Sequence, residues 1–180
     1  MNIFDKNFKE IFFGEIASII GGLIAGTMLA LYTNNLLLIP GMLVALPGFL
    51  EMRGNISGSL ASRISSGLFL RVIKPDRMHT KLVKSNLLAS FFLATVVSLA
   101  LGILAFLFNY MTIKSLSVGI IFLFLIAGVI ANAIEIPLTL IATFFLFRKG
   151  HDPNNIMGSL IISVGDITSI LSLLIALVII

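Results

Sequence analysis

The sequence predicts an all-α integral membrane protein with five transmembrane helices. Hydrophobic residues make up 58% of the chain and charged residues only 11%, whereas about 25% charged residues are usual in soluble domains. The mean hydropathy is +1.13. Since one crossing needs about 20 apolar residues, a chain of 180 residues has room for about five crossings. We therefore expect residues 1–180 to form a single transmembrane domain with no cytosolic regulatory domain.

The first two apolar runs differ in regularity. The first covers residues 11–32 and follows a polar segment without the features of a cleaved signal peptide. The second covers residues 36–70 and is too long for one straight crossing. Pro40, Pro47 and Gly54 interrupt it, and a proline removes a backbone donor from a helix. The second span is therefore predicted to be broken.

The remaining three spans follow in the second half of the chain. Residues 87–108 form an uncharged run, which favours a lipid-facing or packing role. Residues 116–147 are numerous enough for a tilted helix and include Asn132 and Glu135. The fifth span begins after Asp152-Pro153, a pair that suits a helix start because Asp caps helices and Pro is favoured at the first helical position.

The basic residues predict the orientation. Lys and Arg accumulate in cytoplasmic segments of membrane proteins. In this chain they cluster in the N-terminal segment and after the second and fourth spans, at Lys6, Lys9, Arg71, Lys74, Arg77, Lys81, Lys84, Arg148 and Lys149. Only Lys114 falls on the other side. We expect the N-terminus inside, the C-terminus outside, and no nucleic-acid partner, because the net charge of +4 is explained by topology.

Asp166 is the most informative single residue, because it lies inside the last apolar run. A carboxylate near the bilayer centre costs at least ~2.5 kcal/mol unless it is paired, hydrated or bound to a cation. An ionisable residue in such a place indicates a functional site, and a cation pathway is the first hypothesis.

Polar residues recur at helical spacing in three spans, which places each set on one helix face. The sets are Asn55, Ser59, Ser62 and Ser66 in the second span, Asn132, Glu135, Thr139 and Thr143 in the fourth, and Asn155, Ser159, Ser163, Asp166 and Ser169 in the fifth. Such faces are expected to turn toward one another or toward water, forming an oxygen-lined path. The alternative is that these side chains hydrogen-bond across packed helices and have a purely structural role.

The charges inside the spans favour a hard cation. The acids are Glu15, Glu51, Glu135 and Asp166. Two arginines are available to them: Arg63 for any one carboxylate, and Arg53, which lies beside Glu51 in the sequence. At least one acid is then expected to lack a basic partner. The chain has no cysteine, and oxygen ligands suit Mg²⁺ or Ca²⁺. Few carboxylates among many hydroxyls and amides favour Mg²⁺ that keeps most of its waters.

Two motifs resemble the MgtE-type divalent-cation transporters and the related solute carrier family 41. Asp152-Pro153-Asn154-Asn155, followed by a small and apolar stretch and Gly165-Asp166-Ile167-Thr168, is similar to the signature of the family's last helix. Gly54-Asn55 followed by Leu60-Ala61-Ser62-Arg63 is similar to its second-span pattern. Asn154 stands where the family's second signature acid lies.

The resemblance implies a homodimer in the plasma membrane that carries Mg²⁺ through a pore on its two-fold axis. It implies that Asp166 binds the cation. Together with the polar faces, it leads us to expect Asn55, Ser59 and Ser163 along the pore, Glu135 as a secondary cation or proton site, and Asp152 either as a ligand or only as a helix cap. Channel-like conduction and coupling to Na⁺ or protons both remain open.

Two other functions are considered. In a non-transporting assembly subunit, the polar faces would serve packing alone. An intramembrane aspartyl enzyme would need two aspartates sharing a proton, and no other predicted span contains one. We expect no enzymatic activity and no cofactor, with Mg²⁺ as the transported ion.

Overall fold

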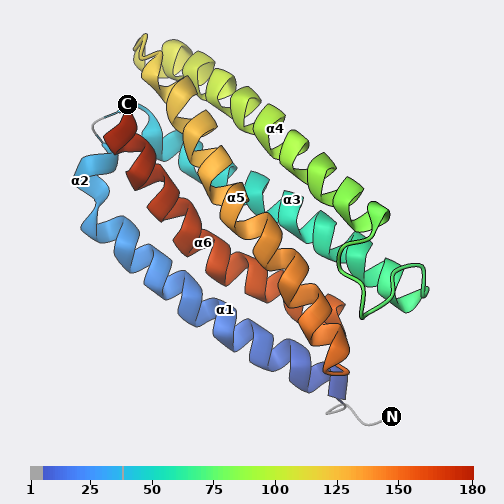
Figure 1. Ribbon diagram of the computed structural model, residues 1–180. Helices are drawn as coiled ribbons and strands as arrows, with labels where there is room; N and C mark the ends of the chain where they lie inside the picture. Colours follow the sequence, from blue (N-terminus) through green and yellow to red (C-terminus); the bar gives the residue numbers. More distant parts are fainter. Residues whose placement is uncertain (1–5, 38) are drawn as a thin grey trace.

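The computed structural model describes residues 6–37 and 39–180. Its long helices run back and forth along one common direction (Figure 1). The helices are α1 (Lys6–Leu31), α2 (Thr33–Leu36), α3 (Met42–Phe69), α4 (Lys81–Ile113), α5 (Gly119–Arg148) and α6 (Pro153–Ile179). The described ranges contain no strand. The predicted all-α fold class is confirmed.

Four helices, α1, α4, α5 and α6, are long and apolar enough to cross a membrane. Helix α3 also runs along the bundle (Figure 1), but it is not among the four. It carries Glu51, Arg53 and Arg63. The chain is a multi-pass membrane protein, and five crossings remain a prediction that depends on whether charged α3 also spans the bilayer.

The prediction of a broken second span is wrong for residues 42–69, which form one continuous helix through Pro47 and Gly54. Pro47 lies in the second turn of α3, so its missing N–H removes a single hydrogen bond near the helix start. Transmembrane helices tolerate this loss when neighbouring helices hold the backbone. Packing of α3 against α4, α5 and α6 provides that support.

The chain does break just before α3. Gly41 has a φ of +74° and is the N-cap of α3, a conformation that favours glycine. Asn109 of α4 closes the turn by donating from Nδ2 to the Pro40 carbonyl oxygen at 2.5 Å. A Cβ at position 41 would collide with the Asn109 side chain. Of the three predicted interruptions, only the one at Pro40 therefore coincides with a turn.

The long helices pack in a definite order. Helix α1 packs mainly on α6, and α6 in turn packs on both α3 and α5. Helix α4 lies on the opposite side of the bundle against α5 and α3 (Figure 1). Helices α3, α5 and α6 are thus in mutual contact, and any side chain they direct inward is removed from lipid.

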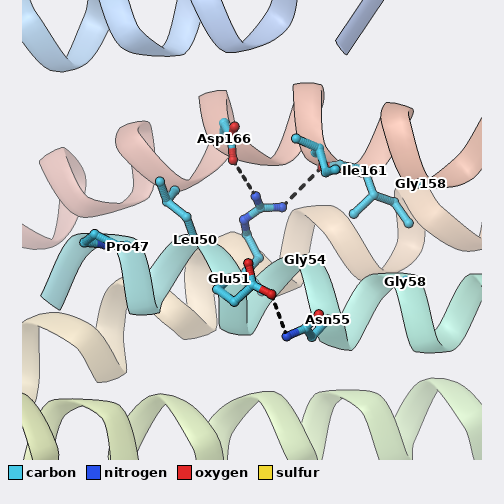
Figure 2. Close-up of a pocket in the computed structure, with 11 residues that line it drawn as sticks. Pro47, Leu50, Glu51, Gly54, Asn55, Gly58, Gly158, Ile161 and Asp166 are labelled. Atoms are coloured by element: carbon cyan, nitrogen blue, oxygen red, sulfur yellow. Dashed lines mark hydrogen bonds and ion pairs between the residues drawn. The ribbon is translucent and has the colours of Figure 1, made fainter. Parts of the chain in front are cut away.

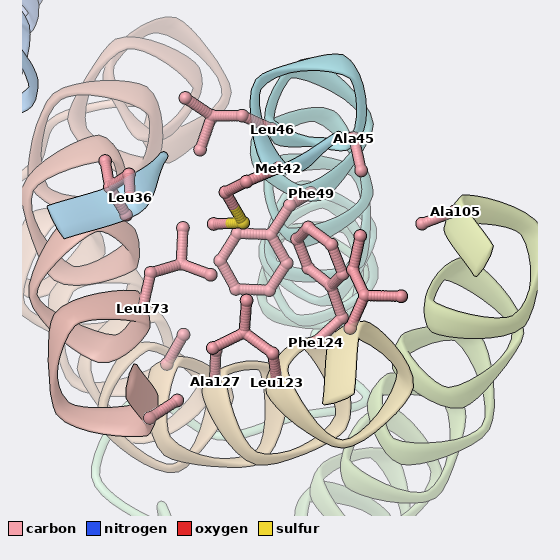
Figure 3. Packing of buried hydrophobic residues seen from close by; sticks show 13 residues of the cluster. Leu36, Met42, Ala45, Leu46, Phe49, Ala105, Leu123, Phe124, Ala127 and Leu173 are labelled. Carbon is pink, nitrogen blue, oxygen red and sulfur yellow. The ribbon is translucent and has the colours of Figure 1, made fainter. Parts of the chain in front are cut away.

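The apolar core is divided into two clusters along the bundle. One surrounds Phe49 of α3 and Phe124 of α5, whose rings are 5.6 Å apart between centroids (Figure 3). The other contains Ile56 of α3 and Ile136 of α5. Since Arg53 lies between Phe49 and Ile56 in the sequence of α3, it lies between the two clusters.

Basic residues gather at one end of the bundle. Lys6 donates to the Gly150 carbonyl oxygen, and Arg148 Nε donates to the Pro75 carbonyl oxygen at 2.6 Å. These bonds bring together the N-terminal segment and the connectors that follow α3 and α5. Lys114 lies at the opposite end of α4. Which end faces the cytoplasm remains a prediction from the charge distribution.

Candidate functional site

A buried arginine joins two acids from different helices. Arg53 of α3 donates from Nη1 to Glu135 Oε1 of α5 at 2.5 Å and from Nη2 to Asp166 Oδ1 of α6 at 2.9 Å. The side chains of Arg53 and Glu135 are 1% and 2% exposed, and that of Asp166 is 22% exposed. We call Arg53, Glu135 and Asp166 the triad. It connects the three central helices by charge-assisted hydrogen bonds, which are stronger than neutral ones.

The approach of Arg53 to α6 depends on Gly165. A Cβ at this position would collide with the Arg53 guanidinium. The same guanidinium lies 3.4 Å from the Ile161 carbonyl oxygen, one turn earlier in α6. The Gly165-Asp166 pair therefore has a physical explanation, since the glycine makes room for the cation that the aspartate binds.

A cavity of about 470 Å³ lies between α3 and α6 beside the triad (Figure 2). Asp166 lines it from the centre of α6, and Arg53 also borders it. The other polar lining comes from Glu51 and Asn55. Three glycines, Gly54, Gly58 and Gly158, contribute no side chain to the wall. Asp166 is thus the triad acid that combines a buried partner with access to open space.

Glu51 does not pair with Arg53, contrary to the simplest interpretation of their closeness in sequence. Asn55 Nδ2 donates to Glu51 Oε1 at 3.2 Å, one turn along the same helix (Figure 2). Both residues are exposed. Among the described residues Glu51 forms no ion pair. It fits the expectation that at least one acid has no basic partner.

Arg63 also binds no carboxylate within the described part of the chain. Its Nη2 donates to Ser90 Oγ at 3.1 Å, and its Nε donates to the Ser59 carbonyl oxygen at 3.2 Å. The possibility that Arg63 neutralises an intramembrane acid is therefore wrong for these residues. Its charge is directed to hydroxyl and carbonyl oxygens at the α3–α4 contact.

The polar face of α3 points out of the bundle. Its members are all exposed: Glu51, Asn55, Ser59, Ser62 and Ser66. By contrast, the polar face of α5, with Asn132, Glu135, Thr139 and Thr143, is fully buried. Of the two predicted arrangements, contact with the other polar faces or contact with water, α3 does not form the first with the buried face of α5. Because polar groups in hydrocarbon need partners, the α3 face requires water or protein against it.

The polar face of α6 is divided between two neighbours. Asp166 turns toward Arg53, whereas Ser159 donates to Glu15 Oε1 of α1 at 2.7 Å. Ser163 donates to the Leu160 carbonyl oxygen of its own helix at 3.2 Å, and a Cβ at Gly21 of α1 would collide with it. Ser163 therefore lies at the α1–α6 contact and does not line the cavity beside Asp166.

Asp152 lies at the start of α6, remote from the triad along that helix. Its Oδ1 accepts a hydrogen bond from the Asn154 backbone N–H at 2.8 Å, and Pro153 occupies the first helical position. Nearby, His151 Nδ1 is 2.8 Å from Glu10 Oε1, and Asn155 Nδ2 donates to Glu10 Oε2 at 3.1 Å. The geometry of Asp152 is that of a helix cap.

Sequence reasoning singled out Asp166 and Glu135 but did not predict that one arginine joins them. It missed Arg53 as the centre of the triad and Gly165 as the residue that admits it. A usable signal was present, because an arginine within an apolar span is expected to pair with other ionisable groups or with backbone carbonyls. In the described ranges no three His, Cys, Asp or Glu side chains are close enough to hold a metal ion together.

A family model described as "Divalent cation transporter", MgtE, matches residues 46–176. The chain belongs to the MgtE family of divalent cation transporters. Searches of curated proteins and of solved structures gave no significant match. The MgtE match begins within α3 and ends within α6, so it contains all three residues of the triad and the entire cavity lining.

Membership in the MgtE family gives the cavity a chemical context. A divalent cation is the substrate of such a transporter, and oxygen ligands of the kind that Asp166, Glu51 and Asn55 present suit Mg²⁺ and Ca²⁺. Helix α1 precedes the matched region. The α1–α6 contact with Glu15 and Ser159 is thus partly outside the MgtE match, whereas the α3–α6 cavity is inside it.

Proposed function

We propose that this protein transports divalent cations, Mg²⁺ in particular, along a path between α3 and α6 in a homodimer. Asp166 of each chain is the central cation-binding carboxylate. The observation that carries this proposal is the position of Asp166, at the centre of an apolar helix and at the wall of a cavity. A carboxylate kept there at the cost of burial is expected to have a function.

The exposed polar face of α3 supports a dimer. Within one chain, Glu51, Asn55 and Ser59 face outward from a helix that packs among membrane-spanning neighbours. Two copies related by a two-fold axis would place this face against its own counterpart. The axis would then be lined by oxygen atoms from both chains, and the two Asp166 carboxylates would face a shared path.

The ligand set favours Mg²⁺ that stays partly hydrated. Asp166 offers one carboxylate per chain, and Asn55 and Ser59 offer neutral oxygens nearby on α3. Mg²⁺ gives up its waters reluctantly and is usually bound through only one or two carboxylates. A cavity of about 470 Å³ has room for several waters, each of which occupies about 30 Å³ in the liquid.

Both channel-like conduction and exchange for Na⁺ or protons are compatible with this arrangement. Glu135 is the candidate for a secondary cation or proton site, since it lies behind Asp166 and shares its arginine. Its ion pair with Arg53 means that a second cation would have to compete with the guanidinium. The plasma membrane, with the N-terminus inside, is the proposed location.

Uptake of Mg²⁺ into liposomes that contain the purified protein tests the proposal. Wild type is compared with Asp166→Ala, with and without an imposed Na⁺ or proton gradient. We expect uptake by wild type and none by the variant, while both elute as dimers in detergent. Dependence on a gradient would identify an exchanger. Absence of wild-type uptake under every gradient would reject the proposal in favour of a non-transporting assembly subunit.

A further inference from the structure

The triad contains more acidic groups than basic ones. One guanidinium contacts two carboxylates at 2.5 and 2.9 Å. The described residues place no other basic side chain in this group. With both carboxyl groups ionised, each chain has one net negative charge at this position. Glu51 is exposed and lies outside the triad.

We infer that Arg53 sets how tightly the transported cation is held, by cancelling one of the two negative charges of the triad. This inference rests on the proposed function, and specifically on paired copies of Asp166. Two triads together carry two negative charges, which one divalent cation neutralises. Without Arg53 the same two chains would present four, an excess over the charge of a single ion.

The contacts assign different parts to the two acids. Glu135 is buried behind the arginine and is not part of the cavity lining, so its charge holds Arg53 in place. Asp166 gives Oδ1 to Arg53, and Oδ2 accepts no hydrogen bond from the described residues. With Asp166 at the cavity wall, Oδ2 is the oxygen available to a cation or to one of its waters.

Weak binding is an advantage in a pathway. Conduction requires that an ion bind well enough to enter and loosely enough to leave. A fixed positive charge close to the binding carboxylate weakens the attraction of the cation by Coulomb repulsion. Arg53 is therefore an affinity-setting residue that acts through Asp166 and is itself no ligand.

The test measures the half-saturating Mg²⁺ concentration for uptake, and the affinity of purified protein for Mn²⁺, in a set of charge variants. Arg53→Met should lower both constants by at least about tenfold, since removal of a unit charge at roughly 5 Å changes the interaction by a few kT or more at an effective dielectric of about 20. Its maximal rate should fall because release slows. Glu135→Gln should raise both constants.

Charge-restored variants separate electrostatics from packing. Arg53→Met combined with Glu135→Gln returns the net charge of the triad to minus one, so its constants should lie near those of wild type. Arg53→Lys keeps the charge and should behave likewise. Arg63→Met removes an arginine from the same helix outside the triad and is the matched control, with a much smaller shift expected. Size-exclusion elution and thermal melting monitor folding in each case.

The outcomes are distinct. Unchanged constants in Arg53→Met, or a double variant that fails to reverse the shift, would overturn the role of Arg53. If Arg53→Met does not fold, Glu135→Gln and the double variant are compared with wild type. The inference then predicts raised constants in Glu135→Gln and constants near those of wild type in the double variant. Wild type without uptake would reject the proposed function, whereas Asp166-dependent uptake with identical constants in every variant would reject this inference alone.

Discussion

The two sides of α6 present similar residues in different settings. Toward α1, a carboxylate and a hydroxyl meet directly, as Ser159 donates to Glu15 at 2.7 Å. Toward α3, Asp166 meets a buried arginine and borders a cavity. Polar groups in both places satisfy the demand for hydrogen bonds within a membrane. Asp166 lines this cavity, whereas neither Ser159 nor Glu15 is among its lining residues.

This difference shows that a polar residue in an apolar helix is by itself weak evidence of a binding site. Ser163 and Asp166 are three residues apart and were both expected along a path. The structure places Ser163 against Gly21 at a close helix contact, as small residues often are in membranes. A counter-ion and an adjoining cavity distinguish Asp166.

Asp166→Asn should reduce uptake by at least about hundredfold, because a charge pair at roughly 4 Å contributes about 4 kcal/mol at an effective dielectric near 20. Asparagine preserves the shape of the side chain, so the cavity should persist. Ser172→Ala is the control on the same helix, since its hydroxyl donates only to the Thr168 carbonyl oxygen. Liposome flux measures both. Equal flux in Asp166→Asn and wild type would remove Asp166 from the site.

Gly165→Val should destabilise the protein by about 1–3 kcal/mol or more, the usual cost of overpacking a well-packed interior. The added side chain would enter the position of the Arg53 guanidinium. Gly158→Val, seven residues earlier on α6, is the control, because a Cβ there meets nothing within 4 Å. Thermal melting in detergent compares the two. A smaller loss in Gly165→Val than in Gly158→Val would contradict the packing of Arg53 against α6.

Much of the fold could be predicted from the sequence, because long apolar runs and their charged flanks have few alternative structures in a membrane. The continuity of α3 could not, since the effect of Pro47 depends on support from neighbouring helices. The importance of Asp166 was also predictable, because a charged side chain in hydrocarbon is costly and usually has a function. Its partner was not, because Arg53 lies closer in sequence to Glu51 than to either acid it binds.

The direction in which the polar face of α3 points could not be predicted from the sequence either. Its four-residue and three-residue spacing predicts that Asn55, Ser59 and Ser62 share a side of the helix. Spacing gives no information on which neighbour that side meets. Only the packing of α3 against α4, α5 and α6 leaves the face outside the bundle. A sequence pattern therefore defined the face, and tertiary structure defined its surroundings.

Glu51→Gln should have an intermediate effect on the α3 side. Glu51 lines the cavity but is exposed and hydrogen-bonded to Asn55, so solvent screens its charge. We expect the half-saturating Mg²⁺ concentration to rise about fivefold, corresponding to roughly 1 kcal/mol at an exposed position. Flux at several Mg²⁺ concentrations measures this. An effect as large as that of Asp166→Asn would mean that Glu51 is the principal cation ligand.

Ser159→Ala should have the smallest effect and thereby test the α1 side. Its hydroxyl hydrogen bond to Glu15 joins two helices, and such bonds contribute about 0.6 kcal/mol on average in membrane proteins. A slight decrease in melting temperature is expected, with flux and its Mg²⁺ dependence within about twofold of wild type, which corresponds to less than ~0.5 kcal/mol. Because Ser159 lies on the same helix as Asp166 but outside the cavity lining, a strong loss of flux with normal stability would extend the pathway to the α1 side. That result would make Glu15 a second carboxylate to consider as a ligand, and it would end the distinction between the two sides of α6.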